Sequence, residues 1–481
     1  MLARTRELPD LGNSWIEREF QHVEFGDERL NSRFYQTVHS LAGKSSGTIK
    51  QSCGEWKDVK GAYRLFANKK VVTDEILASH QIETAKRMSS HNILFAVQDT
   101  SYLDFDSHTK TKGLGSISKA YKKHKKGLML HSSLILSSDG TPLGLSYQKC
   151  WSRDARNETK EEKSQRQYRT RIEDKESFKW IEALQETIRM TPPDTEIITI
   201  GDRESDIFEF MLAAESYQTS FLVRNRQNRR LTNADGVELN IAKQLATTPV
   251  ARQIEVDVPK NTGRSSRYAQ LEVKFTSGNI PIRINAVYGP QRKDRTINQN
   301  VHVYIVSAKE TDPPSGEDPI DWILLTNVSV GCANEAVERI EWYGFRWRIE
   351  EYFRILKSGC AVENCRLSSA DRLIKYITTM SVVAFKILYL SKVALIHPDE
   401  DCSKILSKEE WQALYRREHH TKEIPNDPPT IRNAVVWLGK LGGFMNRKSD
   451  HLPGPMILWR GFETLKESIA MWNIAKHENC G

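Results

Sequence analysis

Apolar residues recur at helical spacing near both ends of the chain, whereas the middle alternates short apolar runs with polar stretches. Residues 1 to about 70 are predicted to be helical, most clearly over FGDERLNSRFYQTVHSLAG and WKDVKGAYRLFANKKV. The last hundred residues also have helical spacing, interrupted by HPDED, IPNDPPT and LGGFMNRKSDHLPGP. The two ends are therefore predicted to be helical regions that flank a different kind of domain.

The region between them mixes strand and helix patterns. ILFAV (93–97) predicts a strand, and LMLHSSLILSS (128–138) with PLGLSYQKCW (142–151) predicts a hairpin. A charged stretch over 152–173 predicts a mobile loop or a frayed helix. ESFKWIEALQETIRM then predicts a helix, IITIG a strand, RESDIFEFMLAAES a helix and TSFLVRNR a strand. Strands joined by crossover helices indicate an α/β sheet covered by helices.

Residues from about 229 to 328 have a mostly β pattern instead. Five apolar or alternating runs are separated by polar turns: QIEVDVP, AQLEVKFTS, IPIRINAVYG, VHVYIVSA and DWILLTNV. A single long helix is predicted to follow over 333–359. We therefore predict three domains, at 1–70, 71–370 and 371–481, with the β block inserted in the second.

Composition narrows the class of protein. The 481 residues carry a net charge of +8, which suits a polyanionic partner without requiring one. The seven cysteines are scattered and odd in number, which favours reduced thiols in a cytoplasmic protein. The N-terminus lacks the apolar core of a signal peptide, and we expect that no apolar run is long enough to span a bilayer.

One stretch, WYGFRWRIEEYFRILKSG (342–359), carries an unusual set of polar residues. With Tyr343 at zero on a helical wheel, Arg346, Glu350 and Lys357 fall at about 300°, 340° and 320°. One reading is an ordinary surface stripe of ion pairs from Arg346 to Glu350 to Arg354. The other is a metal-binding carboxylate flanked by cations that bind phosphate.

Two aspartates bear on this choice, because each follows a predicted strand. Asp99 follows ILFAVQ and Asp202 follows IITIG, and ligands of open α/β sheets gather at such strand ends. Asp202 could instead be the N-cap of the next helix. Together with Glu350, the two aspartates could form a three-carboxylate cluster that holds Mg²⁺ for two-metal phosphodiester chemistry.

These residues resemble a known family. Asp99, Asp202 and Glu350 resemble the DDE triad of bacterial cut-and-paste transposases that have a ribonuclease-H-like core. The spacing from Tyr343 to Lys357 fits the Y-x2-R-x3-E-x6-K signature of one insertion-sequence group of this family. The resemblance includes GAYRLF, QDTS, GDRESDI, FLVR, DWILLTN, RWRIEE and LGGFMNRK. It implies an N-terminal domain that binds transposon-end DNA, a catalytic core with a β insertion, and a C-terminal dimerisation domain.

The resemblance also implies a mechanism. Two Mg²⁺ ions, or Mn²⁺ in their place, would be held by Asp99, Asp202 and Glu350. The enzyme would nick transposon ends, form and open DNA hairpins, and transfer the strands into target DNA within a synaptic homodimer. It would work in the cytoplasm, without a membrane partner.

DNA contacts follow from the same resemblance. Trp322 would stack on a flipped base, although a core tryptophan is the alternative. The cations after FLV could equally be surface charge, and the basic run 119–126 is either a phosphate clamp or a solvated loop. The predicted DNA-binding residues are Tyr343, Arg346, Lys357, Trp322, Arg224, Arg226, Arg64, Arg33, Arg29, Lys57 and Lys60.

Two other classes of protein stay open at this point. One is a two-metal nuclease on the same core that cuts without end specificity or strand transfer. The other is a non-catalytic DNA-binding relic or inhibitor, although all three carboxylates are present.

Overall fold

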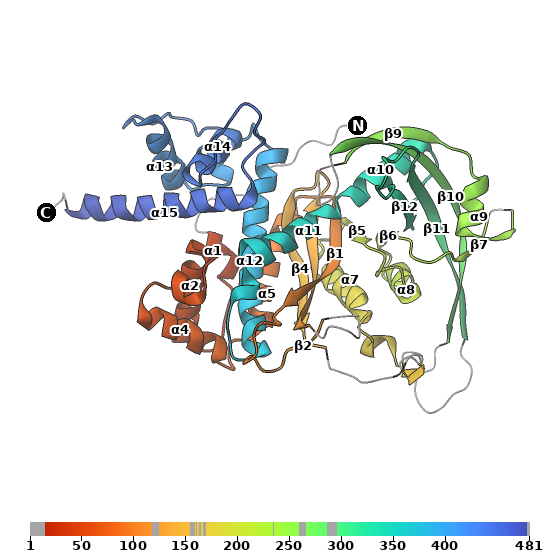
Figure 1. Cartoon of the computed structure of the whole chain (residues 1–481), viewed down its shortest axis with the longest axis horizontal. Helices are drawn as coiled ribbons and strands as arrows, with labels where there is room; N and C mark the ends of the chain where they lie inside the picture. Colours follow the sequence, from red (N-terminus) through yellow and green to blue (C-terminus); the bar gives the residue numbers. More distant parts are fainter. Residues whose placement is uncertain are drawn as a thin grey trace.

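The computed structural model describes residues 15–117, 125–153, 159, 161–162, 165–166, 170–233, 235–258, 266–285 and 296–478 (Figure 1). Two predictions lie largely outside these residues. The basic run 119–126 is described only at Lys125 and Lys126, and much of the charged stretch 152–173 is not described. The described chain is a mixed α/β structure with a helical region at each end.

The N-terminal region is helical, as predicted, over its described part. Asp27 caps the second helix by accepting a hydrogen bond from the Arg29 N–H at 3.1 Å. The Arg33 side chain of the second helix lies over Gly61 of the fourth, where a Cβ would lie 2.9 Å from the guanidinium and would displace it. The helices are α1 (Trp15–Phe20), α2 (Glu28–Gly43), α3 (Ile49–Ser52), α4 (Trp56–Ala67) and α5 (Thr73–Met88).

The core is a twisted sheet whose central strands have the order β4-β3-β1-β5-β6. The pairs β4–β3 and β3–β1 are antiparallel, which confirms the predicted hairpin, and β1–β5 and β5–β6 are parallel. The parallel strands are joined through α7 (Phe178–Met190) and α8 (Phe208–Ser216), so this is the predicted α/β arrangement. The strands are β1 (Ile93–Asp104), β2 (Gly115–Ser116), β3 (Lys126–Ser137), β4 (Pro142–Trp151), β5 (Glu196–Gly201) and β6 (Ser220–Arg224).

The inserted block is mostly β, as predicted, and it continues the same sheet because β12 pairs with β6. The prediction of two strands over 269–289 was wrong. Gly278 and Asn279 pair with β11 inside one long strand, and a Cβ on Gly278 would lie 2.6 Å from Thr232 O. The glycine therefore admits a crossing strand and does not form a turn. The elements are β7 (Arg230–Thr232), β8 (Glu238–Asn240), α9 (Ile241–Thr247), β9 (Arg252–Val258), β10 (Arg267–Asn285), β11 (Thr296–Glu310) and β12 (Asp321–Thr326).

The single helix predicted over 333–359 is divided in the structure. It consists of α10 (Ala333–Gly344), α11 (Trp347–Arg354) and a π-helical turn at Ile355–Gly359. At the break, the N–H groups of Phe345 and Arg346 bond three residues back, to Trp342 and Tyr343. Gly344 is a weak helix former, and the tighter turn re-aims the chain. The helical-wheel angles from Tyr343 to Lys357 therefore do not apply.

The C-terminal region is helical as predicted, and α15 extends away from the body (Figure 1). The expectation that no segment is apolar and long enough to span a membrane was wrong, because α12 meets both criteria. However, 83 % of its apolar window is buried inside the protein, as in the core helix of a soluble protein. The helices are α12 (Ala370–Ile396), α13 (Lys408–His419), α14 (Ile431–Leu441) and α15 (Pro455–Glu478), with short 3₁₀ turns at Ile172–Asp174, Val362–Asn364 and Cys402–Lys404.

Candidate active site

The register of the parallel strands places Asp99 and Asp202 side by side. β1 pairs with β5 up to Val97 opposite Ile200, so two further residues on each strand bring Asp99 level with Asp202. Asp202 directly follows β5, as predicted. Asp99 does not end its strand as predicted, because β3 pairs with β1 as far as Asp104, with Asp99 opposite Ser132. Asp99 therefore lies two residues beyond the last parallel pair, where only the antiparallel partner continues.

Both aspartates face the side of the sheet that α10 and α11 cover. Side chains alternate along a strand, so Asp99 shares its face with Phe95 and Val97. The Phe95 ring contacts Phe345 at 5.2 Å and Trp342 at the same distance. Ile198 and Ile200 belong to the same core cluster as Phe95, which puts Asp202 on this face as well.

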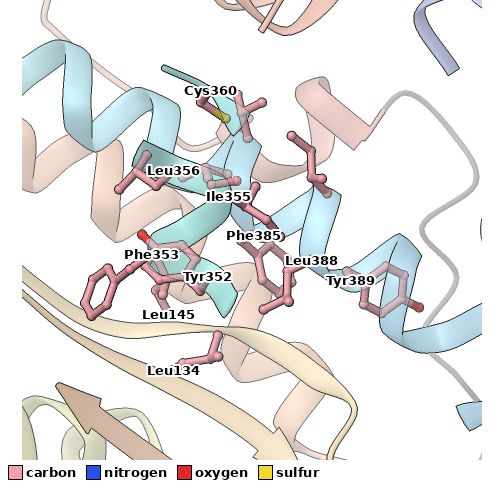
Figure 2. Close-up of a cluster of buried hydrophobic side chains, with 14 of the residues drawn as sticks. Leu134, Leu145, Tyr352, Phe353, Ile355, Leu356, Cys360, Phe385, Leu388 and Tyr389 are labelled. Carbon is pink, nitrogen blue, oxygen red and sulfur yellow. The ribbon is translucent and has the colours of Figure 1, made fainter. Parts of the chain in front are cut away.

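Helix α11 brings Glu350 to this face and is anchored there by its apolar side chains. Figure 2 shows Tyr352, Phe353 and Leu356 of this segment packed among side chains of β3, β4 and α12. Gln148 Nε2 donates to the Tyr352 hydroxyl at 3.2 Å and to Ser381 Oγ at 2.7 Å. These contacts fix the rotation of the short helix and hence the position of Glu350 on its first turn.

The surroundings of the two aspartates disfavour their ionised forms. Burial, and next the charge of Asp202, raise the pKa of Asp99 to about 7. Burial also raises the pKa of Asp202, although the Glu204 N–H donates to its carboxylate at 2.7 Å. Two partly buried carboxylates whose charged forms are disfavoured are stabilised when a cation binds between them.

Glu350 is paired with a cation of its own chain. Arg346 Nη2 lies 2.6 Å from Glu350 Oε1, so the predicted i,i+4 ion pair exists. Within the described residues, no three His, Cys, Asp or Glu side chains converge in a metal-ligating arrangement. The pair Asp99 and Asp202 fits a hard cation by its oxygen donors, and Glu350 would join it only after leaving Arg346.

Beside the carboxylates, Tyr343 and Arg224 present unpaired donors. The Tyr343 hydroxyl and Arg224 Nε are buried, and neither has a hydrogen-bond partner among the described residues. Tyr343 packs edge-on against Trp322 with ring centroids 5.3 Å apart. Arg224 is held by its second amine, which donates to Asp321 O at 2.9 Å. Trp322 is thus half-buried against Tyr343, and the unpaired donors suit an anionic group.

Two of the predicted DNA-binding residues, Lys357 and Arg226, lie apart from Tyr343, Arg224 and Trp322. Lys357 lies in the π-helical turn and donates to Tyr102 O at 2.9 Å, beside the part of β1 that follows Asp99. Arg226 is exposed beyond the end of β6, and its backbone N–H donates to Asp206 at 2.6 Å. Asp202 is not the N-cap of the next helix, because α8 starts only at Phe208, with Ile207 as its N-cap.

The predicted N-terminal contacts lie on α2 and α4. Arg33 is half-buried and pairs with Asp58 at 2.9 Å, which ties the two helices together. Lys60 lies over the exposed Trp56 ring, 5.3 Å from its centroid. Arg29, Lys57, Lys60 and Arg64 are exposed.

One cation near the aspartates was not singled out from the sequence. Lys179, in the first turn of α7, is buried and lies close enough to Asp202 for its charge to oppose the rise in the Asp202 pKa that burial causes. The sequence contains a signal for this residue, because Lys179 falls on the same helical face as the buried Ala183 and Thr187. A lysine on the buried face of a helix requires a partner.

Two parts of the chain match known family models. Residues 12–71 match the family model for a transposase DNA-binding domain. Residues 382–476 match the model for the Tn5 transposase dimerisation domain. The two matches flank the sheet that carries Asp99 and Asp202, and they support a Tn5-type transposase with DNA-binding and dimerisation domains.

Proposed function

We propose that this chain is a DDE transposase that cuts transposon ends and joins them to target DNA. The observation that carries the proposal is the juxtaposition of Asp99 and Asp202 under the helix that bears Glu350. The strand order β4-β3-β1-β5-β6, with antiparallel pairs followed by parallel ones, supports a ribonuclease-H-like core. The Y-x2-R-x3-E-x6-K signature, and a likeness to the transposase of the kanamycin-resistance composite transposon, are part of this proposal.

Asp99, Asp202 and Glu350 would hold two Mg²⁺ ions, with Mn²⁺ as a substitute. When bound, such ions activate the attacking oxygen and stabilise the leaving oxygen at phosphorus, in nicking, hairpin formation, hairpin opening and strand transfer. Two changes in the chain's own residues must occur before the ions bind. Asp99 must lose the proton that its raised pKa retains near neutral pH. Arg346 must release Glu350, and its guanidinium is then free to bind a phosphate.

The unpaired donors beside Trp322 support recognition of a distorted DNA end. A flipped base would stack on Trp322, and the adjacent phosphate would accept hydrogen bonds from Tyr343 and Arg224. Lys357 and Arg226 would contact the backbone further along the strand. The exposed cations of α2 and α4 would bind the transposon end, chiefly through phosphates.

The proposal is tested on DNA that flanks the gene on both sides, cloned around a marker. Purified protein is incubated with Mg²⁺ or EDTA beside a Glu350→Gln variant, and products are resolved on denaturing gels. We expect breaks at fixed positions and hairpin ends that require both Mg²⁺ and Glu350. Scattered nicking would indicate a general nuclease, and specific binding without cutting would indicate a relic or inhibitor.

A further inference from the structure

Lys179 is a buried cation with a specific set of partners. Its side chain is 5 % exposed, and its Nζ lies 3.6 Å from Glu204 and 3.9 Å from Glu176. The ring centroids of Trp151 and Trp180 lie 5.9 and 5.6 Å from the same Nζ. A desolvated ammonium is stable only beside negative charge, so these carboxylates hold the lysine in place, and it holds them.

Glu204 belongs to the turn that carries Asp202. Its N–H donates to Asp202 Oδ1 at 2.7 Å, and the Ser205 hydroxyl donates to Asp202 O at 2.7 Å. The Glu204 carboxylate lies near enough to raise the pKa of Asp202. A further carboxylate therefore lies near Asp202, on the turn that follows β5, and Lys179 is a cation that pairs with it.

We propose that Lys179 is a positioning residue that holds the Glu204 carboxylate away from the cation site formed by Asp99, Asp202 and Glu350. This inference rests on the proposed function. Mg²⁺ demands near-octahedral geometry and keeps several water ligands. An additional carboxylate would displace one of those waters and add negative charge. By pairing with Glu204, Lys179 limits the site to three protein carboxylates and leaves room for water and phosphate.

The test uses full-length protein with Lys179→Met, Glu204→Gln and the double variant. Two quantities are measured: Mn²⁺ affinity, from the free-ion signal in an electron paramagnetic resonance titration, and single-turnover cleavage of end DNA in Mg²⁺. For Lys179→Met we expect tighter Mn²⁺ binding, because Glu204 joins the site, and cleavage slowed roughly 10–100-fold. Glu204→Gln in that background should return both values to those of the wild type.

If Lys179 only stabilised the fold, the second substitution would not restore Mn²⁺ affinity and cleavage. If the double variant stays as impaired as Lys179→Met, or if Lys179→Met matches the wild type in both measurements, the inference is wrong. Glu204→Gln alone changes a partly exposed residue and provides a second route if Lys179→Met does not fold. It should weaken Mn²⁺ binding, because the Glu204 charge then no longer offsets the effect of the Lys179 ammonium on Asp202, and unchanged binding would overturn the inference.

The failure of the proposed function gives a different result. If Glu350→Gln binds Mn²⁺ as the wild type does, Glu350 is not part of a cation site, and the proposed three-carboxylate site is excluded whatever the Lys179 variants do. Glu350-dependent Mn²⁺ binding together with no effect at Lys179 would leave that site intact and overturn only the positioning role.

Discussion

Replacement of Asp99 by asparagine should remove activity and stabilise the protein at once. The pKa of Asp99 rises from 3.8 to about 7 through burial and the charge of Asp202. Between these pH values the folded state retains a proton that the unfolded chain has released. The free energy of unfolding therefore falls as pH increases through this window. The difference, 7 − 3.8, is roughly three pKa units, or at most about 4 kcal/mol above pH 7.

Asparagine has nearly the same shape and no charge to ionise, so Asp99→Asn escapes this cost. We expect the variant to unfold at higher urea concentration than the wild type at pH 8 in EDTA. The two proteins should unfold at similar concentrations at pH 4, where Asp99 is largely protonated in the folded state. Asp312→Asn, at an exposed aspartate, is the matched control and should show no such pH-dependent gain. Addition of Mg²⁺ at pH 8 should stabilise the wild type more than Asp99→Asn.

A stability gain that is equal at pH 4 and pH 8 would refute the reasoning. It would mean that Asp99 is already ionised in the folded protein at low pH. The aspartates would then not be close enough, or not buried enough, to oppose each other's charge. Loss of cleavage without any gain in stability at pH 8 would lead to the same conclusion.

Two further predictions concern ion pairs. Arg346→Met should free Glu350, so the variant should bind Mn²⁺ at least as tightly as the wild type while its cleavage of end DNA falls. A loss of Mn²⁺ affinity in an equilibrium titration would contradict the pairing. His397 joins the β3–β4 turn to the end of α12 through an ion pair with Asp139. Burial alone would lower the pKa of His397, but hydrogen bonding to Asp139 and the charges of Asp139 and Glu400 raise it. Its stabilising contribution is present below pH 6.5 and is lost as pH rises through the raised pKa, so His397→Gln should lower the thermal midpoint more at pH 6 than at pH 9.

Local patterns in the sequence predicted most elements but missed three details: the end of β1, the continuity of β10, and the break between α10 and α11. The stretch after Val97 is polar, so strand prediction stopped there, yet β3 supplies a partner as far as Asp104. Gly278 resembled a turn residue because the strand that crosses it, at Thr232, is far away in the sequence. The helix break at Gly344 was also missed, because the periodicity on its two sides is nearly continuous. In the first two cases a tertiary contact outweighed local preference.

The common face of the site follows from strand alternation that was present in the sequence. Each site residue stands two positions from an apolar residue of the same core cluster, on or directly after one of four neighbouring strands: Asp99 after Val97, Asp202 after Ile200, Arg224 after Leu222, and Trp322 before Leu324. What the pattern could not supply is which helix covers that face. A register shift of one residue in β5 would turn Asp202 to the opposite side, away from Glu350. The buried isoleucines of IITIG therefore determine the chemistry as directly as the carboxylates do, because they fix the face on which Asp202 emerges.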